Sequence, residues 1–234
     1  LSLRRQRQMC IRDRYKRVNK ISIMQLSKDG QKVVGSKISI DCDCLGMSGG
    51  WTPAVHLFTQ SGGKLKFRDE DQVFIPDKYP SDQISIGSCN GEFTLDEILT
   101  DISKKLKDFL NIKKTDYENL EIQSHFNKTK RNIWLLPSDK IIGKTKPFVD
   151  YQNDATAKDI KLALREGFRS IEHVKRYTTT GMGTDQGKLG NMHALGIISE
   201  TAGTKMGEHG TTTFRPPYTP LTFGTIVGLS LIHI

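Results

Sequence analysis

The stretch from residue 149 to residue 188 constrains the fold more than any other part of the chain. Apolar side chains recur there at three- and four-residue steps, which places them on one face of a helix. Thr156 stands at a helix-cap position, with Asp159 near the exposed amides of the first turn, and Ser170 begins a second helix. We therefore predict two short helices that pack through their apolar faces. The inward-facing positions are Ala157, Ile160, Ala163, Leu164, Phe168, Ile171 and Val174.

The polar segment after the second helix is rich in hydroxyls, glycines and amides. It covers residues 178–188 and follows the cations Lys175 and Arg176. Hydroxyls, free backbone amides and cations together suit a phosphate or another anion. A solvated helix end and loop would have the same composition, and chemistry alone favours that second interpretation. The residues therefore leave an anion site and an ordinary loop as alternatives.

The front of the chain predicts β structure. Residues 20–26, 33–34 and 37–44 alternate apolar and polar side chains, which indicates a small antiparallel meander. Residues 64–67 and 83–88 predict two further strands. Strands therefore dominate the first part of the chain and helices the second, and the predicted fold class is α+β.

A helix follows the last predicted strand. Thr94 and Glu97 have the spacing of a capping box, and apolar residues at helical steps then mark a buried face. A strand, a glycine turn at Gly91 and a helix amino end form a geometry that faces an anion. Simple core packing of Phe93 and Leu95 is the alternative to an anion contact at this turn. The buried face of the helix comprises Ile98, Ile102, Leu106 and Phe109.

Four separated blocks identify a family that the chain resembles. In order they read SGGWTPAVHLFTQSGGKLKF, IGSCNGEFTL, REGFRSIEHVKRYTTTGMGTDQGK and GTTTFRPPYTP. This order resembles the alpha subunit of heterotetrameric sarcosine oxidase over nearly all of residues 21–228. The resemblance implies an oxidase that demethylates sarcosine to glycine, passes the one-carbon unit to tetrahydrofolate and releases hydrogen peroxide. It also implies beta, gamma and delta subunits as partners.

The resemblance gives the first part of the chain a cofactor domain. It implies the C-terminal half of a two-dinucleotide, FAD/NAD reductase-like domain, whose GxGxxG fingerprint is absent from this chain. The fingerprint lies upstream in the family, so we expect this piece by itself to hold NAD weakly. The NAD contacts that the family pattern implies here are Ser88, Gly91, Phe93 and Leu95.

The second part resembles a small helical domain derived from a ferredoxin-like [2Fe–2S] domain. The positions that match cluster ligands are Asp150, Gln152, Asp185 and Gly190. None is a thiol, and such clusters are held by thiolates, so we predict no iron–sulfur cluster.

The same resemblance implies that this helical domain covers FMN between the alpha and beta subunits. The cations would face the phosphate and the amide would face the ring. Amine oxidation would take place on a flavin of the beta subunit, so we expect no catalytic acid or base and no metal in this chain, and an isolated piece without activity. The implied FMN contacts are Lys175, Arg176, Thr178, Thr179, Gln186 and Lys188.

The two ends of the chain do not read as native protein. Residues 229–234 and 9–14 correspond to one nucleotide stretch read in opposite orientations, as a sequencing-library adaptor would be. We therefore set residues 1–14 and 229–234 aside. The formal charge of the whole chain is +9, and residues 1–14 carry five arginines and one aspartate, which leaves +5 for the rest. That mild, dispersed excess is only weak support for nucleic-acid binding and fits anionic cofactors at least as well, so we expect no nucleic-acid partner.

Hydropathy and cysteine usage indicate the cellular compartment of the protein. No apolar run is long enough to span a membrane, so we expect no membrane partner. Cys42, Cys44 and Cys89 have neither zinc spacing nor a disulfide framework, which is typical of a reducing cytoplasm.

The predicted organisation and its alternatives follow from these observations. A component of a related FAD/NAD-dependent amine or opine dehydrogenase is the alternative enzyme, and a non-catalytic binding module is the alternative class. The expected parts are a tail at 1–14, the half cofactor domain at 15–114, a linker at 115–146, the helical domain at 147–210, an extended linker toward a folate-binding domain at 211–228 and a second tail at 229–234.

Overall fold

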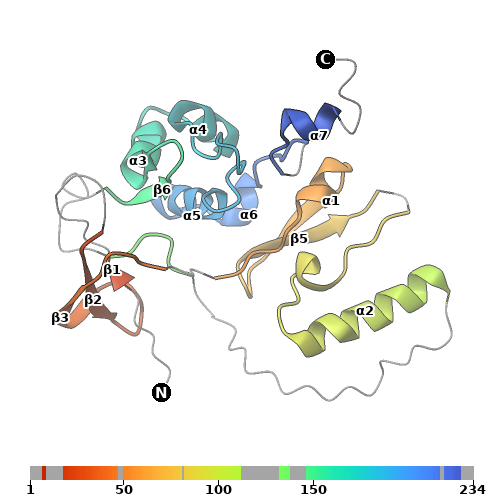
Figure 1. The fold of residues 1–234 in the computed structure, drawn as a ribbon, viewed down its shortest axis with the longest axis horizontal. Helices are drawn as coiled ribbons and strands as arrows, with labels where there is room; N and C mark the ends of the chain where they lie inside the picture. The colour runs from red at the N-terminus through yellow and green to blue at the C-terminus, as the bar shows by residue number, and fades with distance from the viewer. Residues whose placement is uncertain are drawn as a thin grey trace.

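The structure is a computed structural model that combines helices with short β-sheets. It describes residues 7–8, 18–46, 50–80, 82–111, 132–137, 146–216 and 219–227. The predicted adaptor-like residues 229–234 and most of the predicted linker lie outside these ranges. Figure 1 shows a group of helices from residues 157–209 on one side, and on the other a β-hairpin from residues 64–78 with the helices of residues 56–60 and 95–110. This mixture agrees with the predicted α+β class.

The first sheet is an antiparallel meander, as predicted. β2 (Lys20–Leu26) pairs with β3 (Val33–Asp41), and the two-residue β1 (Arg7–Gln8) pairs with the other edge of β2. The sequence pattern separated 33–34 from 37–44, whereas the structure has one strand that runs from Val33 through the first part of the second segment and ends at Asp41. The register shifts between Ile23 and Gln25, so the alternation of side chains is interrupted there. β1 comes from the segment that the sequence analysis set aside.

The second sheet is the hairpin of β4 (Lys64–Arg68) and β5 (Val73–Lys78), which follows the short helix α1 (His56–Gln60). The sequence predicted β4 but not β5. The run from Val73 to Pro76 is buried throughout. Such a strand lacks the apolar–polar alternation by which a half-buried strand is recognised.

The predicted strand at 83–88 is wrong. The backbone there is irregular and leads into a 3₁₀ turn, η1 (Gly87–Asn90), in which Gly87 has φ +66°. Side chains of the next helix take the polar groups that a strand ladder would use. Lys105 Nζ donates to the Ser85 carbonyl at 3.0 Å, and the Gly87 N–H donates to an Asp101 carboxylate oxygen at 2.9 Å.

The next helix, α2 (Leu95–Leu110), begins at the predicted capping box. The Glu97 N–H donates to Thr94 Oγ1, and the Thr94 N–H donates to the Glu97 carboxylate, both at 3.4 Å. None of its residues is fully buried, and Phe109 is 47% exposed. Its predicted inner face is therefore only half covered.

The helical group forms the centre of the core. A short β6–β7 pair (Phe148–Asp150 and Ala155–Thr156) leads into α3 (Ala157–Arg165), α4 (Ile171–Thr178), α5 (Asn191–Ala202) and α6 (Met206–His209). α3 packs against both α4 and α5. Thr156 is the N-cap residue of α3, as predicted, and its N–H and hydroxyl both donate to Asp159. Phe74 of β5 joins this core, so the hairpin and the helices share it. The most deeply buried side chains are Ile160, Val174, Leu195, Ile197 and Ile198.

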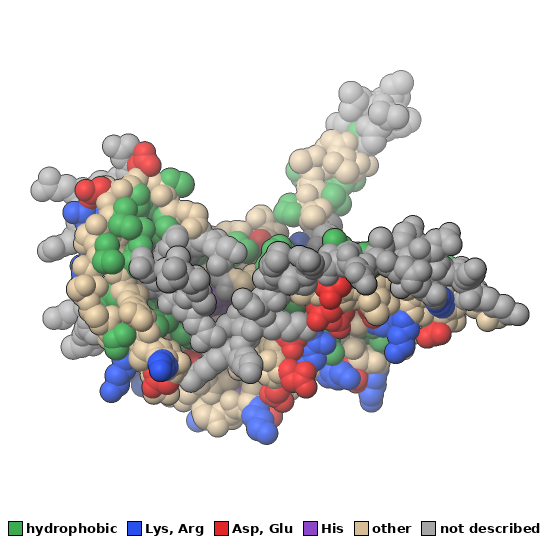
Figure 2. Space-filling view, turned by 90° about the horizontal axis from the view of Figure 1, so that it is seen from below, with side chains coloured by type: hydrophobic (Ala, Val, Ile, Leu, Met, Phe, Trp, Pro, Cys, Tyr) green, Lys and Arg blue, Asp and Glu red, His purple; other side chains and the backbone are tan. Residues whose placement is uncertain are grey.

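The last helix, α7 (Phe223–Val227), stands clear of this core (Figures 1 and 2). Phe223 is 87% exposed and Ile226 is 69% exposed. On the face drawn in Figure 2, Lys/Arg and Asp/Glu side chains are interspersed and form no field of one sign. Among the described residues, no helix has the length and apolarity needed to cross a membrane.

Trp134, in the described segment 132–137, packs against α5 at Gly196. A Cβ built at Gly196 would overlap the indole ring. We expect Gly196→Ala to lower the free energy of unfolding by about 1–3 kcal/mol, because the overpacking outweighs the better helix propensity of alanine. Urea unfolding monitored by circular dichroism measures this change.

The control for Gly196→Ala is the same substitution in a Trp134→Ala background. With the indole removed, the added methyl should be neutral or stabilising. An equal loss in both backgrounds would show that Trp134 does not pack there.

Candidate functional site

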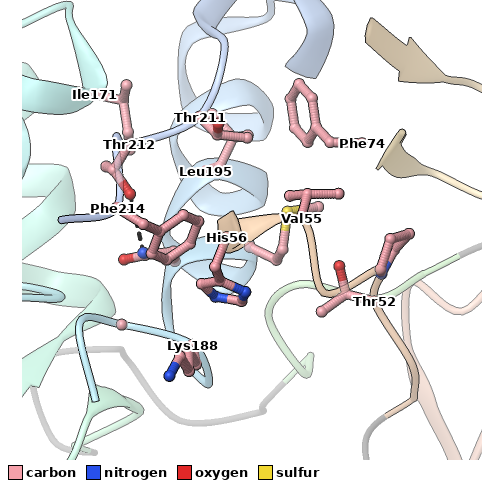
Figure 3. A pocket seen from close by; sticks show the side chains of 14 residues that line it. Thr52, Val55, His56, Phe74, Ile171, Lys188, Leu195, Thr211, Thr212 and Phe214 are labelled. Carbon is pink, nitrogen blue, oxygen red and sulfur yellow. Dashed lines mark hydrogen bonds between the residues drawn. The ribbon is translucent and has the colours of Figure 1, made fainter. Parts of the chain in front are cut away.

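A cavity of about 40 Å³ lies where the hairpin region meets the helical group (Figure 3). One wall comes from the approach to α1, a second from α5 and a third from residues 211–214. A single water needs about 10–15 Å³, so the cavity admits a few waters or one end of a larger ligand. Its apolar lining residues include Pro53, Val55, Phe74, Met192, Leu195 and Phe214, and its polar ones are Thr52, His56, Lys188, Asn191, Thr211 and Thr212.

His56, at the start of α1, is a buried member of this lining. Its ring is 3.9 Å from the ring of Phe214, centroid to centroid. Burial, with the nearby positive charge of Lys188, lowers the pKa of His56 from 6.5 to about 4. The imidazole is therefore neutral near pH 7 and adds no positive charge to the cavity. Nothing in the sequence marked His56 as a site residue except its place in the WTPAVH part of the first matched block.

Lys188 is the predicted FMN contact that lines the cavity. Figure 3 shows its side chain beside His56, below the Phe214 ring. An ammonium group at the edge of an apolar cavity can pair with an anionic or carbonyl edge of a ligand whose body is apolar.

Four other predicted FMN contacts lie at the C-terminal end of α4. Lys175 and Arg176 are in its last turn, where positive charge complements the helix dipole. Arg176 is paired with Glu172, with 3.0 Å between the guanidinium and carboxylate atoms. Thr178 Oγ1 donates to the Val174 carbonyl at 2.8 Å, and Thr179 ends the helix with φ +60°. The structure brings these residues together, but it gives the Arg176 and Thr178 side chains partners of their own.

The positions matched to cluster ligands hold the polar segment by hydrogen bonds. An Asp150 carboxylate oxygen accepts from the Gly181 N–H at 2.7 Å, and Gln152 Oε1 accepts from the Thr184 N–H at 2.8 Å. Asp185 Oδ1 accepts from the Gly187 N–H at 3.0 Å. Oxygen acceptors therefore fix this loop. Within the described part of the chain, no group of three or more His, Cys, Asp or Glu side chains is placed to hold a metal ion.

Gln186, the amide predicted to face the flavin ring, contacts the backbone of Arg215. Its Nε2 donates to the Arg215 carbonyl and its Oε1 accepts from the Arg215 N–H, both at 2.8 Å. The side-chain amide thus ties the loop to the segment that leaves the helical group.

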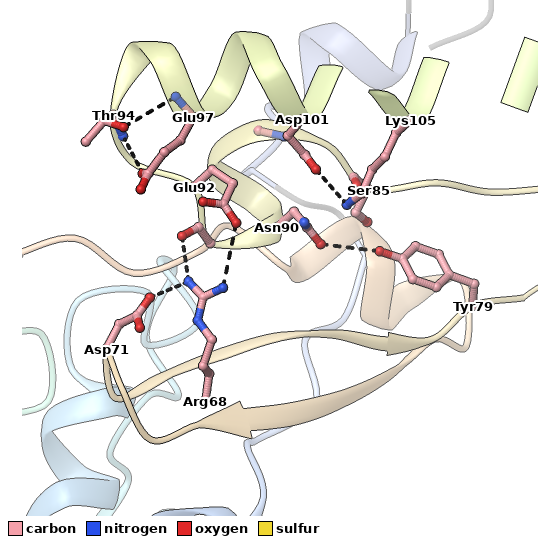
Figure 4. A network of polar contacts seen from close by, with 12 residues as sticks. Arg68, Asp71, Tyr79, Ser85, Asn90, Glu92, Thr94, Glu97, Asp101 and Lys105 are labelled. Carbon is pink, nitrogen blue, oxygen red and sulfur yellow. Dashed lines mark hydrogen bonds and ion pairs between the residues drawn. The ribbon is translucent and has the colours of Figure 1, made fainter. Parts of the chain in front are cut away.

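The predicted NAD contacts lie between η1 and the first residue of α2. Figure 4 shows the polar contacts around this stretch. Arg68 donates to the Gly91 carbonyl at 2.7 Å and also pairs with Asp71 and Glu92, which fixes this turn on the hairpin. Ser88 lies in η1, and Leu95 is 56% exposed at the first position of α2. The four residues lie on one short stretch of backbone.

The anion-facing geometry predicted at this turn is not formed. The strand is missing, and the amino end of α2 carries Asp96 and Glu97 in its first turn. Glu97 also occupies the Thr94 N–H. Carboxylates at a helix amino end offset the partial positive charge that would attract a phosphate.

Comparison with known proteins gives these sites a context. Residues 144–228 match the sarcosine oxidase A3 domain. The chain is 36% identical over 210 residues to the sarcosine oxidase alpha subunit of Rhizobium meliloti (strain 1021), and 32% identical over 215 residues to that of Corynebacterium sp. (strain P-1). These matches take in 85% and 89% of this chain. The chain belongs to the sarcosine oxidase alpha-subunit family.

The sarcosine oxidase relatives are much longer than this chain. It spans 20% of the Rhizobium meliloti protein and 22% of the Corynebacterium one. An opine oxidase subunit from Rhizobium meliloti (strain 1021) is 33% identical over 76 residues, or 32% of this chain and 17% of that protein. The fold resembles L-proline dehydrogenase from P. horikoshii, with a TM-score of 0.56 at 18% identity, over 91% of this chain and 42% of that one.

Proposed function

We propose that the chain is part of a sarcosine oxidase alpha subunit that supports a flavin, FMN, at a contact with the beta subunit. The intact enzyme would oxidise sarcosine to glycine, pass the one-carbon unit to tetrahydrofolate and release hydrogen peroxide. The observation that carries this proposal is the alpha-subunit relationship combined with the Lys188 cavity. Gamma and delta subunits would complete the assembly.

The lining of the cavity fits one edge of a flavin. Apolar side chains such as Met192 and Phe214 suit the ring, and the Lys188 ammonium suits a carbonyl or anionic edge. A volume of about 40 Å³ excludes the whole ring system. Most of it would therefore lie outside this chain, for another subunit to cover. When bound, the flavin supplies the redox chemistry of amine oxidation.

The other proposed FMN contacts would act at the rim. Lys175 and Arg176 at the end of α4 would meet a phosphate electrostatically, with Arg176 shared between the ligand and Glu172. Thr178 and Thr179 would offer hydroxyl oxygens. Gln186 would act through the loop it holds, because both ends of its amide contact Arg215.

NAD is the second proposed cofactor. Ser88, Gly91, Phe93 and Leu95 would contact it through backbone and apolar groups, since carboxylates occupy the amino end of α2. The exposed Leu95 side chain supports an apolar contact of this kind. Arg68 would serve this site indirectly by fixing the Gly91 turn.

An opine oxidase component is the second candidate. The match to the opine oxidase protein of Rhizobium meliloti favours it over part of the chain. The sarcosine oxidase relatives match a much larger share of the chain, so we rank that function first.

The test is the flavin content of the complex that co-purifies with the tagged chain from cells that also express the other subunits. We expect FMN in this complex, and we expect Lys188→Met to lower its FMN affinity by about tenfold or more, because a charge-assisted contact is lost. Acid release followed by chromatography identifies and measures the flavin.

Lys158→Met, on the exposed face of α3, is the matched control and should leave FMN unchanged. A complex without any flavin would contradict the proposed function. Equal FMN affinity in the Lys188→Met and wild-type complexes would remove Lys188 from the site.

A further inference from the structure

Two segments meet beside the cavity. The polar loop is residues 178–188, and the exit strap is residues 211–215. Thr211, Thr212 and Phe214 of the exit strap line the cavity, as does Lys188 of the polar loop. The relative position of the two segments therefore sets the shape of the cavity.

Gln186 joins the polar loop to the exit strap at two points. Its side-chain amide donates to the Arg215 carbonyl and accepts from the Arg215 N–H, as a neighbouring strand would. Gln186 itself has φ +52°, a left-handed conformation that glutamine seldom adopts. The contacts of the loop hold it there.

Asn191 makes a second connection between the polar loop and the exit strap. Its Nδ2 donates to the Gln186 carbonyl at 3.0 Å and to Thr212 Oγ1 at 2.9 Å. Its Oδ1 lies against the backbone of Gly181 and Gly187, where a Cβ on either residue would overlap it. The polar loop therefore wraps closely around a side chain that also holds the exit strap.

Asp150 fixes the far side of the polar loop. It is 7% exposed, and it accepts from the Gly181 N–H as well as from the N–H groups of Gln152 and Asn153. Burial raises the pKa of Asp150, but these hydrogen bonds outweigh burial and hold the pKa below its ordinary value of 3.8. The carboxylate is thus ionised when it anchors the loop.

We propose that Gln186 and Asn191 are positioning residues that couple the polar loop to the exit strap as one mechanical unit. A displacement of the chain beyond residue 215 would then reach Lys188 and the Phe214 wall of the cavity together. This gives the cavity a route by which the segment that carries α7 can regulate it. The coupling is a property of the chain itself, and only its effect on a flavin rests on the proposed function.

Amide hydrogen exchange in the full chain tests the coupling without any flavin. In Gln186→Met we expect exchange at the Arg215 amide to rise by about tenfold or more, since both contacts are lost. We also expect faster exchange at Gly181, Gly187 and Thr213, none of which bonds to the Gln186 side chain. Gln186→Glu keeps the acceptor for the Arg215 N–H and should show a smaller effect at every site.

Gln83→Met is the matched control, because it loses a side-chain contact with Ser61 far from the loop. It should leave all four amides unchanged. Faster exchange at Arg215 alone in Gln186→Met would overturn the coupling, and unchanged exchange at Arg215 would show that Gln186 does not hold the strap. If Gln186→Met unfolds, the same comparison applies to Gln186→Glu. Neither outcome depends on whether FMN binds.

Discussion

Ile198→Ala is expected to lower the free energy of unfolding by about 2–5 kcal/mol. Ile198 is fully buried in α5, at the centre of the core that α3, α4, α5 and Phe74 of the hairpin share. The substitution removes buried apolar atoms and leaves a cavity that close-packed neighbours fill only in part. Because the core is shared, we expect the hairpin and the helices to lose stability together. Urea unfolding followed by circular dichroism and by tryptophan fluorescence measures the change.

Ile226→Ala is the control for that experiment. Ile226 lies in α7 and is 69% exposed, so its truncation should change the free energy of unfolding by less than about 0.5 kcal/mol. Similar losses in the two variants would contradict the assignment of the core to the helical group.

The chain should lose stability in mild acid because of His56. Its pKa is 6.5 when unfolded and about 4 when folded. Below pH 6.5 the unfolded chain binds a proton that the folded chain does not, so stability falls until the pH reaches about 4, where the folded imidazole also protonates. The full loss is on the order of 3 kcal/mol, since each unit of pKa corresponds to about 1.4 kcal/mol. Urea unfolding at pH 7.5 and pH 5 should show about 2 kcal/mol of it.

His56→Leu tests this pH dependence. It should remove the part of the difference in stability between pH 7.5 and pH 5 that His56 causes, while the lowered pKa of His193 leaves a contribution of the same sign. His173→Leu, at an exposed position on α4, should keep the difference. A wild-type pH dependence in His56→Leu would show that His56 is not the buried group responsible.

Local sequence signals predicted α2, α3 and α4 with their caps, but not the short helices α1 and α7. The apolar spacing of Ile160 and Leu164 and the Thr156–Asp159 cap lie within ten residues of one another, and both appear in the structure. The capping box of Thr94 and Glu97 likewise depends on residues three apart. Such signals survive because a helix satisfies its hydrogen bonds within its own segment.

The strands were harder to predict because each depends on a distant partner. β5 reads as an apolar run, and only its pairing with β4 shows it to be a strand. The segment at 83–88 has the pattern of a strand, but Lys105 and Asp101 of α2 form hydrogen bonds with its backbone carbonyl and N–H groups. No periodicity within six residues reports which polar group a lysine twenty residues away will meet.

The candidate site also combines features that the local sequence predicted with features that depend on distant contacts. The composition of residues 175–188 indicated a polar cluster, and the family resemblance gave it a ligand. His56, Phe214 and Asn191 carried no signal of their own, because their roles arise from contacts between segments far apart in the chain. The contact between Gln186 and Arg215 also joins segments far apart in the chain, whereas Arg176 and Glu172 are only four residues apart on one helix.

The sequence alone determined α3 and α4, the caps at Thr156 and Ser170, the inward face of these two helices, and the resemblance to the alpha-subunit family. The tertiary structure alone decided that the helical group shares a core with the hairpin, that a cavity lies between them, and that the loop beside it is tied to the exit strap. The physical reason is the sequence separation over which each interaction acts. Helix periodicity and capping act between residues a few positions apart, whereas cavities, buried imidazoles and loop anchors exist only where distant segments pack together.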